Sequence, residues 1–124
     1  MKILFLDDNE SRHAQFEYEH QGDSLFKAYT VQEAINFLKD NSPFDIVYLD
    51  HDLGPVVTTS NSIFPASTED TGYEVARYIS IMSDKLRPKE VIVHSWNPAG
   101  AARMRDILVE ADVHVSYKPF TIKN

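Results

Sequence analysis

Cysteine is missing from the sequence, which excludes disulfide bonds and any chemistry that needs a thiolate. Long apolar runs are missing too, and none approaches the roughly 18 residues of a membrane-spanning helix. The first apolar stretch, residues 3–6, is followed at once by two aspartates, which is not the pattern of a secretory signal peptide. These absences predict a cytoplasmic protein without a membrane partner.

Positive charge is also scarce in this chain. Lysine and arginine together number 12, against 19 aspartates and glutamates, which leaves a net charge of −7. A broad nucleic-acid surface needs clustered lysine and arginine, so the composition disfavours one, although a small anion pocket remains compatible with it. The length of 124 residues suits a single compact domain over residues 1–124.

Short apolar runs alternate with helical patterns along the chain. Strands are predicted at residues 2–7, 25–30, 45–50, 90–95 and 113–117, and helices at residues 9–20, 30–41, 71–86 and 97–111. This alternation predicts the α/β class, with a doubly wound, five-stranded parallel sheet covered on both faces. Residues 54–70 carry no periodicity and are predicted to be a loop insertion, which could serve as a lid over a binding edge or be disordered.

Two of the predicted helices begin with a capping box. Thr30 is followed three residues later by Glu33, and Thr71 by Glu74. A third helix has Asn97 at the capping position and a proline directly after it, which needs no N–H partner at the first helical position.

Polar side chains follow four of the five predicted strands. In a doubly wound sheet, ligands bind beyond the carboxyl ends of the strands, at the point where the strand order reverses. We therefore expect these side chains to meet at one edge of the sheet. They are Asp7 and Asp8 after the first strand, Asp50, His51 and Asp52 after the third, His94 to Asn97 after the fourth, and Lys118 after the fifth.

These residues, in this order, resemble the receiver domain of two-component response regulators. The resemblance implies the strand order 2-1-3-4-5, with Asp7 and Asp8 holding a divalent metal, Mg²⁺, and Asp50 as the phosphoacceptor. It also implies that Ser95 is the switch hydroxyl and that Lys118 pairs with the phosphoryl group. The physical chemistry agrees, because carboxylates close together repel one another and need a hard cation to coexist.

Some features depart from the usual receiver pattern. The connection from Asp50 to Gly72 is longer than in receivers, and no fifth helix follows residues 118–120. The motifs LDDNESRH, LDHDLG and VHSWN are similar to those of a branch named cyclic-phosphate processing receiver domains (cREC). This likeness implies a partner that carries a cyclic phosphate, either a nucleotide or an RNA end. In receivers the residue at the position of Asp52 gives the metal a backbone carbonyl.

The two histidines beside the predicted pocket invite a catalytic interpretation. Side chains alternate along a strand, so if Asp50 and Ser95 face the pocket, His51 and His94 should point away from it and towards each other. Two imidazoles beside a phosphate would suit general acid–base hydrolysis of a cyclic phosphodiester, a metal-assisted phosphodiesterase reaction. Alternatively, each histidine caps a strand end, or both bind a transition metal together with Asp52.

Three further residues are candidates for binding phosphate. Arg12 lies one turn into the first predicted helix, from where its guanidinium could reach an anion, or it could be an ordinary solvent-exposed charge. Asn97 and Gly100 lie in the first turn of the fourth helix, whose free N–H groups could bind an anion, with the glycine allowing close approach. The alternative is that Asn97 is a plain helix cap.

Two other functions remain open from the sequence. The chain could be a single-domain response regulator that a histidine kinase phosphorylates on Asp50, or a non-catalytic interaction module that retained the pocket for stability. Without a fifth helix, the sheet face near the first helix would be thinly covered, which predicts a homodimer or another partner there.

Overall fold

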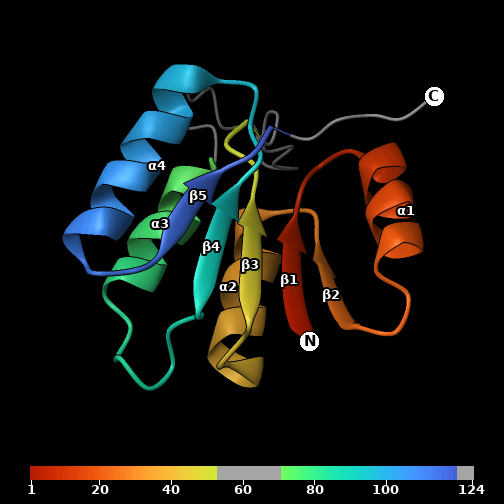
Figure 1. Cartoon of the computed structure of the whole chain (residues 1–124), viewed down its shortest axis with the longest axis horizontal. Helices are drawn as coiled ribbons and strands as arrows, with labels where there is room; N and C mark the ends of the chain where they lie inside the picture. The colour runs from red at the N-terminus through yellow and green to blue at the C-terminus, as the bar shows by residue number, and fades with distance from the viewer. Residues whose placement is uncertain (53–70, 120–124) are drawn as a thin grey trace, which may run out of the picture.

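The structure, a computed structural model, describes residues 1–52 and 71–119 (Figure 1). The predicted insertion at residues 54–70 lies outside this part of the chain. The elements alternate as β1 (Lys2–Leu6), α1 (Glu10–Glu19), β2 (Ser24–Ala28), α2 (Val31–Asn41), β3 (Ile46–Leu49), α3 (Gly72–Ser80), β4 (Glu90–Val93), α4 (Pro98–Glu110) and β5 (Val115–Tyr117).

The five strands form one parallel sheet in the order β2-β1-β3-β4-β5. This confirms the predicted fold class and strand order. The chain moves from β1 outward to β2 and then returns to place β3 on the other side of β1, so the strand order reverses between β1 and β3. The carboxyl ends of β1 and β3 therefore frame the place where a ligand binds in a sheet of this kind.

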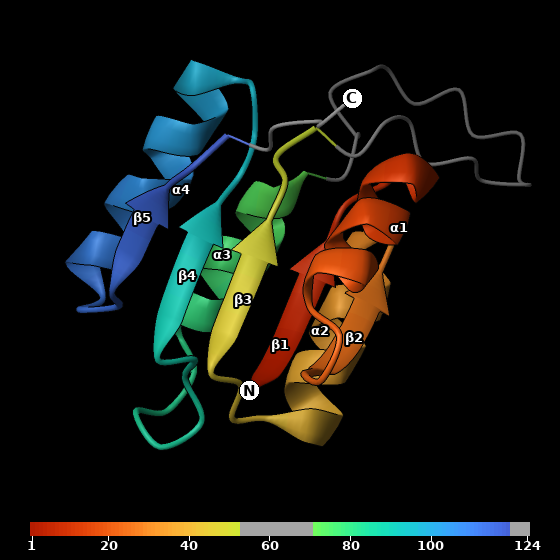
Figure 2. The same cartoon turned by 45° about the vertical axis from the view of Figure 1, so that its right-hand side comes forward.

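Helices cover the two faces of the sheet unequally. Helices α2, α3 and α4 lie on one face, whereas among the described residues only α1 lies on the other, beside β1 and β2 (Figures 1 and 2). The larger core cluster packs against the three helices and includes alternate strand residues such as Leu4, Leu6, Val47 and Leu49. The smaller cluster lies under α1 and is centred on aromatic side chains, including Phe5.

Capping signals set the starts of the helices. Thr30 Oγ1 accepts the N–H of Glu33 at 3.1 Å, as the capping box predicts, whereas Glu33 Oε1 accepts the N–H of Tyr29 at 2.8 Å, one residue before the cap. Asn97 Oδ1 accepts the N–H of Gly100 at 3.0 Å, which confirms it as a helix cap. This cap fixes where α4 meets the carboxyl edge of the sheet.

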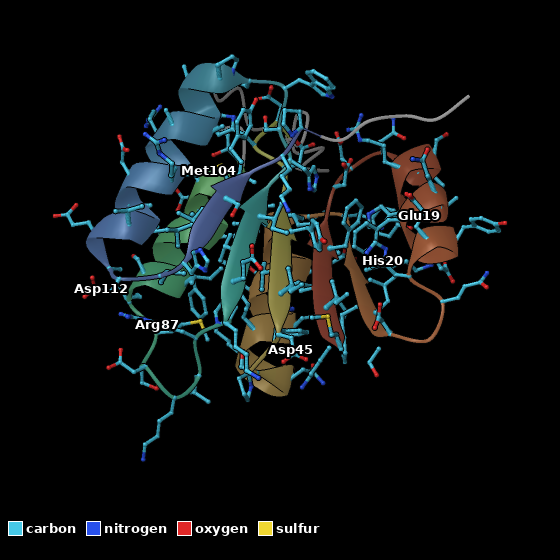
Figure 3. All side chains as sticks on the ribbon, in the orientation of Figure 1. Glu19, His20, Asp45, Arg87, Met104 and Asp112 are labelled. Atoms are coloured by element: carbon cyan, nitrogen blue, oxygen red, sulfur yellow. The ribbon has the colours of Figure 1, made fainter. Side chains whose placement is uncertain are left out.

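Helix α3 is shorter than the sequence predicts. It ends at Ser80 instead of residue 86, and its amphipathic pattern runs on into a turn. The guanidinium of Arg87 donates to the carbonyls of Ser80, Met82 and Ala111, at 3.1, 3.0 and 2.7 Å. The bonds to Ser80 and Met82 take up carbonyls that a longer α3 would have used, and the bond to Ala111 reaches the end of α4. Figure 3 shows Arg87 near Asp112, at the end of the molecule away from the carboxyl ends of the strands.

None of the helices in residues 1–52 and 71–119 is both long enough and apolar enough to cross a membrane.

Candidate functional site

The register between β3 and β4 decides which side chains share the pocket. Leu49 pairs with Val93, and His94 N–H donates to the Leu49 carbonyl at 3.0 Å, so the next pair in line is Asp50 with His94. The condition stated from the sequence, that Asp50 and Ser95 both face the pocket, is therefore not met. Because a slip of one residue turns a side chain to the other face, His94 shares the α1 face with Asp50.

Asp7 is the centre of this pocket and is fully buried at the end of β1. Arg12 donates to both of its oxygens, Nε to Oδ2 at 2.7 Å and Nη2 to Oδ1 at 2.8 Å. Asn9 N–H donates to Oδ1 at 2.8 Å, and His94 Nε2 lies 3.1 Å from Oδ2. Burial alone would raise the pKa of Asp7, but the hydrogen bonds from His94 and Arg12 outweigh it and hold the pKa at about 2.

Asp50 lies in the same pocket, but its pKa is shifted in the opposite direction from that of Asp7. Its carboxyl is buried, and among the described residues its closest positive charge is Arg12 Nη2, 3.5 Å from Oδ2. Burial and the negative charge of Asp7 raise the pKa of Asp50 to about 7, although Arg12 opposes them. Near neutral pH, Asp50 is therefore able to hold or release a proton.

His94 closes the pocket from β4. It is buried, and its ring stacks on Phe5 with centroids 4.9 Å apart. Burial holds the pKa of His94 below its usual range, although the hydrogen bond and charge of Asp7 work in the other direction. The neutral ring then donates Nε2–H to Asp7.

Asp7, Asp50 and His94 together form a donor set suitable for a metal. Each offers one ligand atom, these atoms lie within 4.8 Å of one another, and all three residues are buried. Two carboxylates and an imidazole fit a divalent cation, and the nitrogen suits Mn²⁺, Fe²⁺ or Zn²⁺ better than it suits Mg²⁺. Asp8, which the sequence places in the metal set, is partly exposed, with Arg12 Nη2 3.7 Å from its Oδ1.

His51 belongs to a second cluster on the α4 side of the sheet edge. Its Nδ1 lies 2.7 Å from Asp52 Oδ1, which also accepts Asn97 Nδ2–H at 3.2 Å. The hydrogen bond from His51 lowers the pKa of Asp52. Because His94 faces α1 and His51 faces α4, the expectation that the two histidines point towards each other is wrong.

The space above Gly100 holds the His51 ring. A Cβ built on Gly100 would lie 2.5 Å from His51 Cγ, well inside van der Waals contact. The sequence predicts that Gly100 allows an anion to approach closely. In the structure the group that approaches it is the His51 imidazole. The N–H of Gly100 is also taken by Asn97 Oδ1.

Ser95 and Lys118 lie at the same edge with different surroundings. Ser95 is buried, and its Oγ accepts Asn97 N–H at 3.0 Å, which shapes the turn into α4. Lys118 N–H donates to the Val93 carbonyl at 2.9 Å, which continues the ladder and places Lys118 level with His94. The Lys118 side chain is exposed and forms no hydrogen bond or ion pair with the residues the structure describes.

Two residues near the site were not identified as site residues from the sequence. Gly72 begins α3 so close to Asp50 that a Cβ would lie 1.9 Å from the Asp50 carbonyl oxygen. A glycine directly after the Thr71 cap was the available signal. His13 is buried under the site, with Nε2 2.7 Å from the Asp7 carbonyl oxygen, and helical periodicity alone could not place it there.

Comparison with known proteins identifies a family and a shared fold. The family model of the cyclic-phosphate processing receiver domain matches residues 2–110. No curated protein matches the sequence. A response regulator from Burkholderia pseudomallei, solved with a phosphorylated aspartic acid, a calcium ion and citrate, has 19% sequence identity and a TM-score of 0.61. The match covers 96% of this chain, which spans 60% of that one.

A second solved structure, a fusion that carries the trimeric coiled coil of yeast Spc42, has 17% identity and a TM-score of 0.62. The match covers 97% of this chain and 69% of that one. At these identities the two structures show the shared fold alone.

Proposed function

The chain belongs to the cyclic-phosphate processing receiver domains, and from this premise we propose that it binds and hydrolyses a cyclic phosphate at the carboxyl edge of its sheet. The substrate class would be a nucleotide or an RNA end that carries a cyclic phosphodiester. The observation that carries the proposal is the convergence of Asp7, Asp50 and His94, three buried groups with ligand atoms within 4.8 Å of one another.

In this proposal Asp7, Asp50 and His94 hold a divalent cation, with Asp8 and the backbone carbonyl of Asp52 as further oxygen donors. A bound cation polarises a phosphoryl oxygen and lowers the pKa of a bound water. Arg12 and Lys118 lie at the same edge and would balance the charge of the phosphate ester.

His51 is the proposed general base. A proton on Nδ1 donates to Asp52, which leaves a lone pair on Nε2, and no described residue donates a hydrogen bond to that nitrogen. His51 would accept a proton from the attacking water as the new P–O bond forms. The old ester P–O bond then breaks, the leaving oxygen takes a proton from solvent water, and His51 returns its proton to solvent, which gives a phosphomonoester. Ser95, Asn97 and Gly100 support this arrangement by shaping the turn and seating the imidazole.

The test is turnover of 2′,3′-cyclic nucleotides and of RNA with 2′,3′-cyclic ends, in Mg²⁺, in Mn²⁺ and with a chelator. We expect turnover that the chelator abolishes and that falls by roughly 100-fold or more in His51→Ala and His94→Ala. His114→Ala, which removes an exposed histidine at the opposite edge, is the matched control and should keep full activity. Equal turnover by all four proteins, or binding without turnover, would contradict the hydrolytic mechanism.

A second candidate is phosphorylation of Asp50 in two-component signalling. It is supported by the position of Asp50 at the end of β3, next to Asp7, in a fold shared with a response regulator solved with a phosphorylated aspartic acid. Incubation with acetyl phosphate followed by peptide mass spectrometry separates the two functions. An adduct on Asp50 that is lost in Asp50→Asn supports the signalling function, and its absence from protein saturated with Mg²⁺ counts against it.

A further inference from the structure

Every hydrogen-bonding position of the Asp7 carboxylate is already filled. Its Oδ1 accepts from Arg12 Nη2 and from Asn9 N–H, and its Oδ2 accepts from Arg12 Nε and from His94 Nε2. An ionised carboxylate has about four lone-pair positions on its two oxygens. A metal ion can therefore bind Asp7 only if one of these donors gives up its position.

The three donors differ in their freedom to leave. Asn9 is the N-cap of α1, so its backbone N–H is held by the helix start. His94 is 3% exposed and stacked on Phe5, so its ring stays in place, and as a metal ligand it would free only its one position on Oδ2, the oxygen that Arg12 Nε also holds. Arg12 has a long side chain that is 21% exposed, so its guanidinium alone can swing out to solvent without breaking the core.

Arg12 also supplies the positive charge that a metal would bring. Its Nη2 lies 3.5 Å from Asp50 Oδ2 and 3.7 Å from Asp8 Oδ1, in addition to the two bonds to Asp7. One guanidinium thus offsets part of the repulsion among three carboxylates.

We propose that Arg12 is a built-in counter-cation that a divalent metal displaces, so that the Arg12–Asp7 ion pair and metal binding exclude each other. This inference rests on the metal site of the proposed function and adds a form of regulation to it. The metal must compete with a bidentate guanidinium, which raises the metal concentration at which the site loads. By linkage, metal binding weakens the Arg12–Asp7 pair by the same factor.

The test is isothermal titration calorimetry of Mg²⁺ and of Mn²⁺ into the wild type, Arg12→Gln and Arg77→Gln. The last variant removes an equal charge from an exposed site on α3 and controls for net charge. We expect Arg12→Gln to bind the metal at least about fivefold more tightly than the wild type, and Arg77→Gln to stay within about twofold. Equal or weaker binding by Arg12→Gln overturns the proposal.

A measurement on the wild type covers the case in which Arg12→Gln does not fold without metal. Nuclear magnetic resonance of ¹⁵N-labelled protein follows the Arg12 Nε–H during titration with Mg²⁺. The signal should exchange slowly with water in chelator, then shift and exchange faster at saturation. An Nε–H that stays protected from exchange at metal saturation overturns the displacement of Arg12 but leaves the proposed metal site standing. Failure of every protein to bind metal overturns it together with the metal site.

Discussion

At the scale of single residues, the main feature is a pair of aspartates that share one pocket and titrate far apart. Asp7 receives hydrogen bonds from Arg12 and His94 and has a pKa of about 2, whereas Asp50 has a pKa of about 7. The same guanidinium contacts both, but it is bidentate only on Asp7. Neighbouring carboxyl groups whose pKa values are pushed apart are typical of sites that move protons or bind cations.

The raised pKa of Asp50 predicts how stability depends on pH in the metal-free protein. Between about pH 4 and pH 7 the folded state binds more protons at Asp50 than the unfolded state, so stability falls as the pH rises through this window. Asp50→Asn removes the buried charge and should flatten that slope. In urea unfolding with a chelator, we expect the variant to gain about 1–3 kcal/mol over wild type at pH 8 and little at pH 4.

Asp106→Asn is the control for this measurement, because it removes a carboxylate that is exposed on α4. It should leave the pH profile parallel to that of the wild type. A slope between pH 4 and 7 that survives in Asp50→Asn would show that another group causes it. Asp7, with its lowered pKa, has the opposite sign: its contribution is present above about pH 4 and is lost as the pH falls towards 2.

At the scale of elements, two glycines allow helices to approach the strand ends. Gly100 in the first turn of α4 leaves room for the His51 ring, with Asn97 as the cap beside it. Gly72 at the start of α3 lies against the Asp50 carbonyl. The start of α4 thus packs against His51 and the start of α3 against Asp50, and a Cβ on either glycine would clash with its neighbour.

Gly100→Ala should displace the His51 ring and destabilise the fold by about 1–3 kcal/mol, because the new Cβ would lie 2.5 Å from the ring. The double variant Gly100→Ala/His51→Ala removes the clash and should recover most of the loss, since alanine is the better helix former by about 1 kcal/mol. Chemical unfolding of the two single variants and the double variant measures the coupling. Additive effects would contradict direct contact.

Gly72→Ala should be the more damaging glycine substitution. Its Cβ would meet the backbone carbonyl of Asp50 at 1.9 Å, and a backbone atom at a strand end cannot move aside as a side chain can. We expect a loss of at least about 3 kcal/mol, or failure to fold. Unfolding curves alongside Gly100→Ala test the order, and a smaller loss for Gly72→Ala would be inconsistent with this packing.

At the scale of the whole molecule, the two faces of the sheet differ in cover. Three helices lie behind the sheet, and among the described residues α1 alone lies in front, beside β1 and β2 (Figures 1 and 2). The front of β4 and β5 carries Ile92 and Ser116, which are in register; no described helix lies over them, although Ile92 is buried and Ser116 is half-buried. The expectation of a homodimer or partner on this face stays a prediction.

Multi-angle light scattering checks the dimer. We expect a mass twice that of the chain at high protein concentration, and a shift towards monomer in Ser116→Glu, which places a charge on the open face of β5. Arg105→Glu changes an exposed residue of α4 on the other side and should leave the mass unchanged. A monomeric wild type at all concentrations counts against self-association.

The sequence alone determined the order of elements, the parallel sheet and the edge where polar residues gather. The elements follow from local periodicity, which can be read directly from the sequence. Their arrangement follows from the general rule that crossovers between parallel strands are right-handed. Thr30 and Asn97 were identifiable as caps for the same reason. The family likeness rested on motifs in a fixed order, and a match over residues 2–110 confirmed it.

Tertiary structure alone decided which of these polar side chains touch. Whether His94 or Ser95 lies level with Asp50 depends on the register between β3 and β4, which arises from long-range packing and leaves no mark on either strand by itself. The same holds for Arg12, which from the sequence could bind an anion or be an ordinary exposed charge, and which the fold places on Asp7. A slip of one residue exchanges the two faces of a strand, and so the pairing of the histidines could not be deduced from the sequence.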